Sequence, residues 1–144
     1  MRRGLLVVLL LTLPSGCGAS SPPSAQLHDQ ATRICQPATR RLKRIPTPRP
    51  GDYEGFLRHG LAVLQPQLAR LRSLRPQGDE RDVFAGALDA LSQEITAVKG
   101  AAQSLGRHQD PRLVFAALER RLSPLEAQAD AAWRALQIPA CLSR

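Results

Sequence analysis

The sequence of 144 residues is poor in the residue types that build β-sheets. It has only five aromatic residues, and valine, isoleucine and threonine together supply 15, whereas leucine and alanine supply 43. Because strands favour β-branched and aromatic residues and helices favour alanine and leucine, this composition disfavours a sheet-based fold. No apolar run approaches the roughly 20 residues that a membrane-spanning helix needs, and the length allows one ordinary domain.

The motifs of common enzymes and metal centres are also absent. The sequence contains no Cys-x-x-Cys, no His-Glu-x-x-His and no Glu-x-x-His of the kind that di-iron bundles use. Met1 is the only methionine, which excludes a His/Met haem site, and the scattered glycines form no phosphate-binding loop. We therefore expect a protein that is not an enzyme and carries no cofactor.

The N-terminal segment has the three-part layout of a secretory signal. Arg2 and Arg3 give it a positive start, residues 4–13 are apolar except for Thr12, and small residues surround Cys17. The apolar run is too short to span a bilayer, so we expect residues 1–16 to be a signal peptide. The alternative is a buried N-terminal helix, although the run offers no solvent-facing side.

The residues before Cys17 resemble a known class of signal sequence. Ser15-Gly16-Cys17 resembles the end of a bacterial prolipoprotein signal, although Pro14 stands where an aliphatic residue is usual. The resemblance covers residues 1–17 only. It implies that Cys17 becomes the mature N-terminus, is lipidated, and anchors the protein to a membrane facing outside the cytoplasm. The alternative is a cut after Ala19, which would release a secreted, soluble protein.

The remaining sequence predicts four helices. Residues 17–24 are rich in Gly, Ser and Pro and are expected to form a flexible tether, followed by a helical domain over residues 25–144. Apolar residues recur every three or four positions over residues 25–45, 53–74, 80–105 and 111–136. Short connectors rich in Pro and Gly separate these segments and place consecutive helices antiparallel. The sequence therefore predicts an all-α, up-down-up-down four-helix bundle.

Individual residues predict the ends and bends of these helices. Asp52, Asp79 and Asp110 are placed to cap the starts of the last three helices, and Gly106 is placed to end the third. Three prolines fall inside helices and should bend them, either opening a pocket in the bundle or kinking the helices around a solid core. These prolines are Pro37, Pro66 and Pro124.

Cys35 and Cys141 predict a disulfide, since an exported chain with two further thiols usually joins them. Cys35 lies near the middle of the first expected helix, roughly 15 Å from its start. The tail after Leu136 must therefore fold back, or the helix must break near Pro37. A metal pair and a reactive thiol are the alternatives, but no third soft ligand accompanies the two cysteines.

Arginines gather on the first expected helix, away from its apolar stripe. Arg33, Arg40 and Arg44 follow an i, i+7, i+11 course and Arg41 flanks them. We expect these four residues to contact anionic lipid headgroups or a phosphate-bearing wall polymer. Nucleic acid is not expected as a partner, because no aromatic residues interleave for base stacking. The alternative is an ordinary solvated face, partly neutralised by Asp29.

The remaining ionisable residues indicate a metal site only weakly. His59 and His108 could approach each other at one end of the bundle, whereas His28 would lie at the other end. Asp79, Glu80 and Asp82 could attract a cation, but helix capping and the helix dipole explain them equally well. We expect no metal site.

Together these features predict an exported, lipid-anchored protein of the cell envelope that acts as a binding or scaffolding module. The alternative is a bundle that binds a small ligand or a metal between bent helices. The sequence identifies no protein partner.

Overall fold

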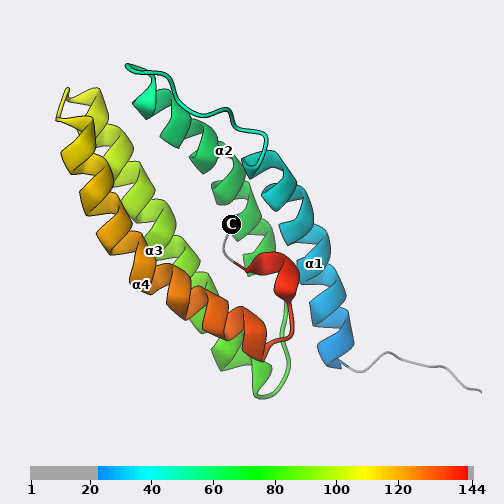
Figure 1. The fold of residues 1–144 in the computed structure, drawn as a ribbon. Helices are drawn as coiled ribbons and strands as arrows, with labels where there is room; N and C mark the ends of the chain where they lie inside the picture. Colours follow the sequence, from blue (N-terminus) through cyan, green and yellow to red (C-terminus); the bar gives the residue numbers. More distant parts are fainter. Residues whose placement is uncertain (1–22, 143–144) are drawn as a thin grey trace, which may run out of the picture.

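The computed structural model describes residues 23–142, which form four α-helices and one short 3-10 helix (Figure 1). The helices are α1 (Pro23–Leu42), α2 (Tyr53–Arg72), α3 (Glu80–Gly106) and α4 (Pro111–Ala135), and the tail contains η1 (Pro139–Cys141). No strand occurs among the described residues. The predicted all-α helical bundle is confirmed.

The helix boundaries fall within about three residues of the predicted ones. The largest difference is at the end of α1, where the helix stops at Leu42 rather than near Ile45. Arg44 and Ile45 continue only in turns, as their backbone N–H groups donate to the carbonyls of Arg41 and Leu42. The prolines after residue 45 explain the early end, because they disfavour helical backbone in the residues before them.

Two aromatic pairs show how the ends of α2, α3 and α4 lie in the bundle. The ring of Phe84, near the start of α3, packs edge-on against Trp133, near the end of α4, with centroids 5.8 Å apart. Tyr53 and Phe115, at the starts of α2 and α4, form a similar pair at 5.6 Å. The starts of α2 and α4 therefore lie at one end of the bundle, and the start of α3 lies at the other.

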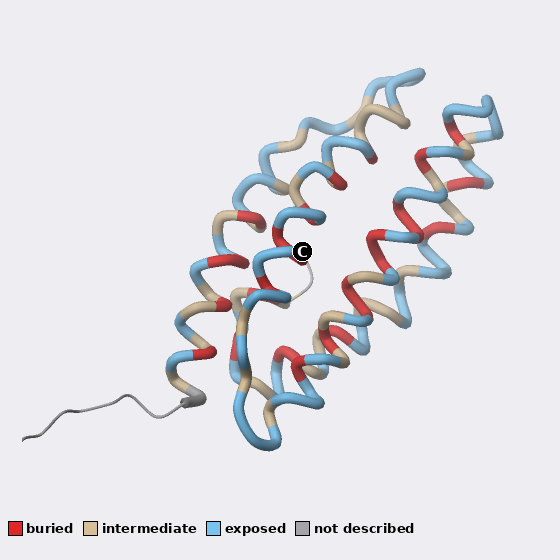
Figure 2. Tube along the Cα trace, turned by 180° about the vertical axis from the view of Figure 1, so that it is seen from behind, coloured by how far each residue is buried: buried red, intermediate tan, exposed pale blue. Residues whose placement is uncertain are grey.

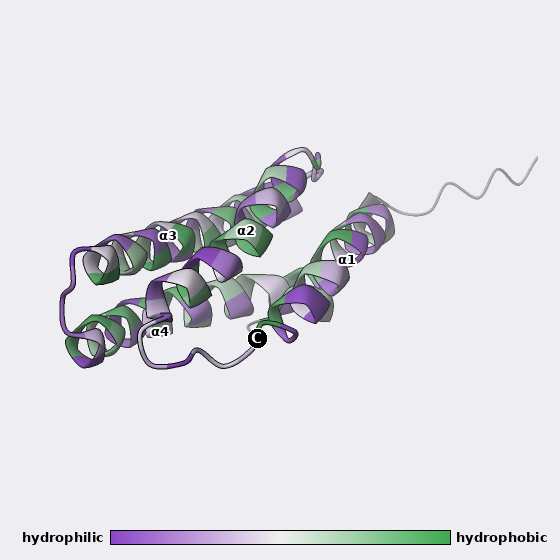
Figure 3. Cartoon of the chain, turned by 90° about the horizontal axis from the view of Figure 1, so that it is seen from above, coloured by the Kyte–Doolittle hydropathy of each residue, from purple (hydrophilic) through white to green (hydrophobic). Residues whose placement is uncertain are grey.

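The core is a continuous set of leucine, alanine and larger apolar side chains from every helix. Buried positions alternate with exposed ones around each helix, as Figure 2 shows along the chain and Figure 3 shows by hydropathy. Trp133, Leu71 and Leu91 are among the largest fully buried side chains. The periodicity that predicts the helices thus also identifies most of their buried faces.

The chain segment after α4 completes the bundle. It turns back and places η1 against α1, so that the tail lies between α1 and α4 over part of their length (Figure 1). Helix α1 otherwise packs mainly on α2, and α4 packs mainly on α3. Ile138 in this tail is completely buried. The contact that α1 and α4 would make in a closed four-helix bundle is therefore made through the tail.

Only one of the three predicted aspartate caps forms. The Asp110 side chain accepts a hydrogen bond of 2.9 Å from the Arg112 N–H, and Pro111 occupies the first turn. Asp52 and Asp79 precede α2 and α3 but make no such bond. The backbone explains the difference, because a capping residue needs an extended conformation. Asp110 has a ψ of 118°, whereas Asp52 and Asp79 have values of 25° and −19°.

Helix α3 ends at Gly106 as predicted, but the glycine is not the left-handed residue of the terminal turn. Gly106 is the last residue of the helix, and the chain turns at His108, whose φ is 61°. Helix α4 ends in the same manner at Gln137, with a φ of 57°. In both turns the next N–H donates back into the helix, from Gln109 to the Ser104 carbonyl and from Ile138 to that of Trp133. Both helices therefore use a left-handed residue other than glycine in their terminal turn.

Candidate functional site

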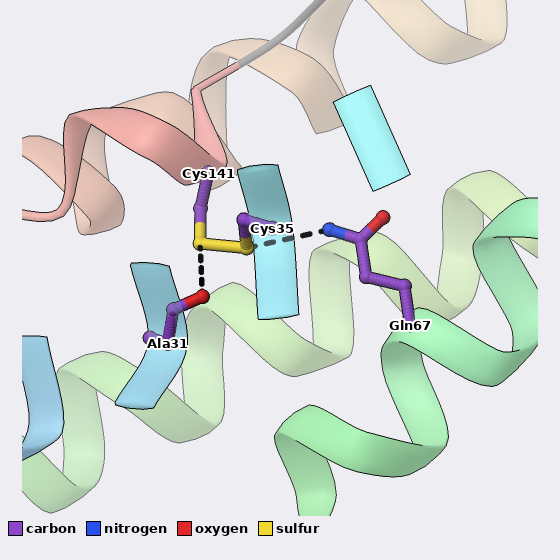
Figure 4. Close-up of a disulfide and its surroundings, with 4 residues drawn as sticks. All are labelled: Ala31, Cys35, Gln67 and Cys141. Atoms are coloured by element: carbon purple, nitrogen blue, oxygen red, sulfur yellow. Dashed lines mark hydrogen bonds between the residues drawn. A yellow bond between two sulfur atoms is a disulfide. The ribbon is translucent and has the colours of Figure 1, made fainter. Parts of the chain in front are cut away.

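The predicted disulfide joins Cys35 in the middle of α1 to Cys141 in η1 (Figure 4). The Cα atoms lie 5.1 Å apart, and the two residues are separated by 106 positions in the sequence. Helix α1 continues unbroken through Pro37, so it is the tail that folds back to meet it. The disulfide prediction is confirmed, and the alternatives of a metal pair and a reactive thiol do not apply.

The disulfide lies in a buried environment with few polar groups. Cys35 is 0% exposed and Cys141 is 2% exposed. The Gln67 amide on α2 donates a hydrogen bond of 3.4 Å to the Cys35 sulfur (Figure 4). The Cys141 sulfur lies 3.8 Å from the Ala31 carbonyl oxygen, a contact and not a hydrogen bond, because a disulfide sulfur has no proton to donate. The disulfide therefore ties α1, α2 and the tail together inside the core.

The four predicted anion-contacting arginines are all exposed. Arg33, Arg40 and Arg41 lie on α1, and Arg44 lies in the turn directly after it. We call these four residues the arginine face. At 100° per residue, Arg33 and Arg40 lie about 20° apart around the axis of α1, on the side away from the buried stripe. The structure therefore leaves this set open to solvent.

A hollow of about 760 Å³ adjoins the arginine face, between α1 and the tail. Arg40 and Lys43 line it together with the uncharged polar side chains of Thr32, Gln36 and Thr39. The tail contributes only apolar or small residues to its other wall. This hollow offers two cations and several hydrogen-bonding groups, a combination that suits an anionic group.

A second hollow, the central groove, opens between the helices themselves. It has a volume of about 420 Å³ and receives residues from all four helices. Its lining includes one apolar residue from each helix and two carboxylates. These are Leu42, Phe56, Val98 and Leu122, with Glu94 on α3 and Glu126 on α4. Pro124, one of the three prolines inside helices, stands between Leu122 and Glu126 in the sequence of α4 but does not line the groove.

The polar residues of the interior were not predicted from the sequence. Glu94 is 6% exposed and Gln67 is 3% exposed. Their spacing carries the signal, because Glu94 stands three residues after Leu91 and four before Val98, which places it on the buried face of α3. Gln67 has the same relation to Leu64 and Leu71 on α2. Because charged and amide residues usually lie on the surface, the buried positions of Glu94 and Gln67 are easily overlooked.

The histidines and acidic residues gather into no metal site in the region that the structure covers. Residues 23–142 contain no group of three or more His, Cys, Asp or Glu side chains that could hold a metal ion. His59 and His108 are exposed, and His28 lies 3.3 Å from the Asp29 carboxylate at the other end of the bundle. Asp79 precedes α3 without a cap bond, and Glu80 and Asp82 lie in the first turn of that helix.

Two i, i+4 ion pairs on helix surfaces are also present. Glu54 pairs with Arg58 on α2, and Asp130 pairs with Arg134 on α4 at 3.5 Å. Both stabilise their helices and need no further function.

The predicted signal and lipidation site lie outside the described residues. Cys17 and residues 1–16 precede Pro23, where α1 begins, and so does most of the expected tether. Helix α1 begins two residues earlier than the expected start at Ala25. Among residues 23–142, no helix is long and apolar enough to cross a membrane.

Comparisons with known proteins assign no function to this arrangement. No protein-family model matches the chain, and neither does any curated protein or solved structure. The function must therefore be argued from the residues of this chain.

Proposed function

We propose that the chain is an exported protein of the cell envelope, anchored by a lipid on Cys17, and that it acts as a binding or scaffolding module rather than an enzyme. The observation that carries this proposal is the buried Cys35–Cys141 disulfide. Disulfides persist in oxidising compartments and are rare in the reducing cytosol. The disulfide supports export, which the prolipoprotein-like signal before Cys17 also predicts.

The anchor and the arginine face would act together. Only residues 18–22 separate Cys17 from the start of α1, and five residues span at most about 18 Å. A lipid on Cys17 would therefore hold α1 close to the membrane. With α1 lying along the surface, the arginine face and the adjoining hollow would meet anionic headgroups or wall phosphates, at about 1 kcal/mol for each Lys or Arg near the surface.

The anchor is tested by the mass of the protein in the membrane fraction. We expect a chain that begins at Cys17 and carries the added mass of a diacylglycerol and any further acyl chain. The Cys17→Ser variant should leave the membrane fraction, whereas the Arg2→Lys variant should stay there. An unlipidated chain that begins at Ser20 would show that the cut follows Ala19 and would end the anchoring proposal.

The arginine face is tested by binding to vesicles of phosphatidylglycerol and phosphatidylcholine. Replacing its four arginines with glutamine should weaken binding by up to roughly a thousandfold at low salt, because about 4 kcal/mol of attraction is lost. The effect should shrink as salt is raised. A matched control replaces four exposed arginines elsewhere, namely Arg107, Arg112, Arg120 and Arg121. Equal losses in both variants, or binding that ignores salt, would contradict a dedicated arginine face.

A further inference from the structure

Helix α4 carries the most exposed large apolar side chain of the described residues. Leu113, in the first turn of that helix, is 71% exposed. Within residues 23–142 the only other exposed large apolar side chain is that of Val83, at 36%. A single exposed leucine is common on protein surfaces and indicates no partner by itself. The surroundings of Leu113 therefore decide whether it belongs to a binding surface.

A hollow of about 650 Å³ lies beside Leu113, between α3 and α4. Helix α3 contributes four small residues to its lining, namely Ala97, Gly100, Ala101 and Ser104. A Cβ added at Gly100 would meet no atom within 4 Å, so the recess is open at that point. The same surface thus has a protruding leucine next to a recess lined by small side chains. Such a surface is self-complementary, because a twofold axis brings the protrusion of each copy to the recess of the other.

The charges at the two ends of this surface are also complementary. Asp110, Leu113, Ala117 and Arg121 all line the hollow, and their spacing of three, four and four residues places them along one side of α4. The Asp110 carboxylate accepts its capping bond from Arg112 through Oδ1 only. Arg121 forms no ion pair among the described residues. A twofold axis that crosses α4 between residues 115 and 116 would place each Asp110 opposite Arg121 of the other copy.

We propose that this surface binds a second copy of the chain in an antiparallel dimer. Leu113 of each copy enters the hollow of the other, and Asp110 of each copy pairs with Arg121 of the other. The strip from Asp110 to Arg121 is about 16 Å long and, at the width of two helices, about 20 Å wide. That area is smaller than a standard interface, so the dimer is weak and reversible. It uses α3 and α4, and it depends neither on the lipid anchor nor on the arginine face.

Sedimentation equilibrium of the full chain, with its disulfide intact, tests the association. We expect a monomer–dimer equilibrium with a dissociation constant between about 10 µM and 1 mM. Because Leu113 is largely exposed, Leu113→Gln should keep the fold, as circular dichroism would show, and weaken the dimer at least tenfold. The matched control is Val83→Gln, which removes the other exposed apolar side chain outside the hollow and should stay within twofold. A wild-type chain that stays monomeric up to about 1 mM, or equal effects of the two substitutions, would overturn the proposal.

Filling the hollow tests its location. Gly100→Gln places a long polar side chain in the recess without an initial clash. Gly86→Gln is the matched control, because Gly86 also lies inside α3 with open space around a Cβ but does not line the hollow. Both substitutions remove a glycine from a helix interior, so neither should unfold the chain. Dimer affinity should fall at least tenfold in Gly100→Gln and stay within twofold in Gly86→Gln, and an unchanged affinity in Gly100→Gln would refute the site.

The antiparallel pairing is tested by Asp110→Asn in two backgrounds. In the wild-type chain this substitution removes an attractive charge and should weaken the dimer about threefold, while asparagine still serves as a helix cap. In an Arg121→Glu chain the same substitution removes a repulsive charge and should strengthen the dimer by a similar factor. Within one copy the two residues are about 16 Å apart along α4, too far for direct contact, so a change of sign requires contact between copies. The same sign in both backgrounds would contradict the pairing of Asp110 with Arg121.

Discussion

Reduction of the Cys35–Cys141 disulfide should lower the free energy of unfolding by several kcal/mol. The two cysteines are 106 residues apart, so the disulfide constrains almost the whole described chain in the unfolded state. In the chain-entropy treatment, a closed loop of this length contributes about 4.7 kcal/mol at 25 °C. A domain of this size loses about 4 °C of melting temperature for each kcal/mol, so the expected decrease is roughly 15 to 20 °C.

The assay is thermal unfolding followed by far-UV circular dichroism, with and without a reductant that is added before heating. The double variant Cys35→Ala/Cys141→Ala is the control, because the reductant should not change its melting temperature. A reduced wild-type chain that melts within about 2 °C of the oxidised chain would refute the reasoning, since the loop-closure argument requires a large difference.

A double-mutant cycle separates two contributions to the free energy of unfolding, namely loop closure by the disulfide and the docking of the tail on α1. Ile138 is completely buried, so Ile138→Ala should cost about 2–5 kcal/mol in the oxidised chain. If the disulfide holds the tail on α1, the same substitution should cost much less once the disulfide is reduced. Equal costs in the two states would show that the tail docks without the disulfide.

Three further predictions concern single positions. Gly86→Ala should raise the free energy of unfolding by about 0.5–1 kcal/mol, measured by urea denaturation, because Gly86 is inside α3 and a Cβ there meets no atom within 4 Å. Gln137→Gly should raise the melting temperature by a few degrees, since a left-handed residue other than glycine costs roughly 1–2 kcal/mol. Trp133→Ala should cost about 3–5 kcal/mol, measured by circular dichroism in urea, because Trp133 is buried against Phe84. A neutral result at Trp133 would contradict its place in the core.

The helices could be predicted because their sequence signals are local. Apolar spacing along one chain segment decides which face is buried, and prolines or glycines between segments mark the connectors. The α3 stripe from Phe84 to Leu105 shows this, since it predicts both the element and most of its buried residues. The cap at Asp110 was predictable for the same reason, because Pro111 follows it and reinforces a helix start.

The remaining features depend on contacts between distant segments, which no local pattern encodes. The sequence shows that Cys35 and Cys141 could pair only if the tail folds back or α1 breaks, and it does not distinguish the two. The structure shows that the tail folds back, because η1 packs against an unbroken α1. The carboxylate pair of the central groove is similar, because Glu94 and Glu126 come from different helices and meet one hollow only in the folded bundle.

The position of the disulfide also constrains the order of events during folding. Helices α2, α3 and α4 all lie between its two cysteines, so each must be synthesised before the bond can form. Until then the tail is absent from its place beside α1, and the core lacks Ile138. The chain therefore stays less stable while it is reduced and gains its full stability only after oxidation. One covalent bond thus separates a less stable, newly synthesised form of the chain from its fully stable form.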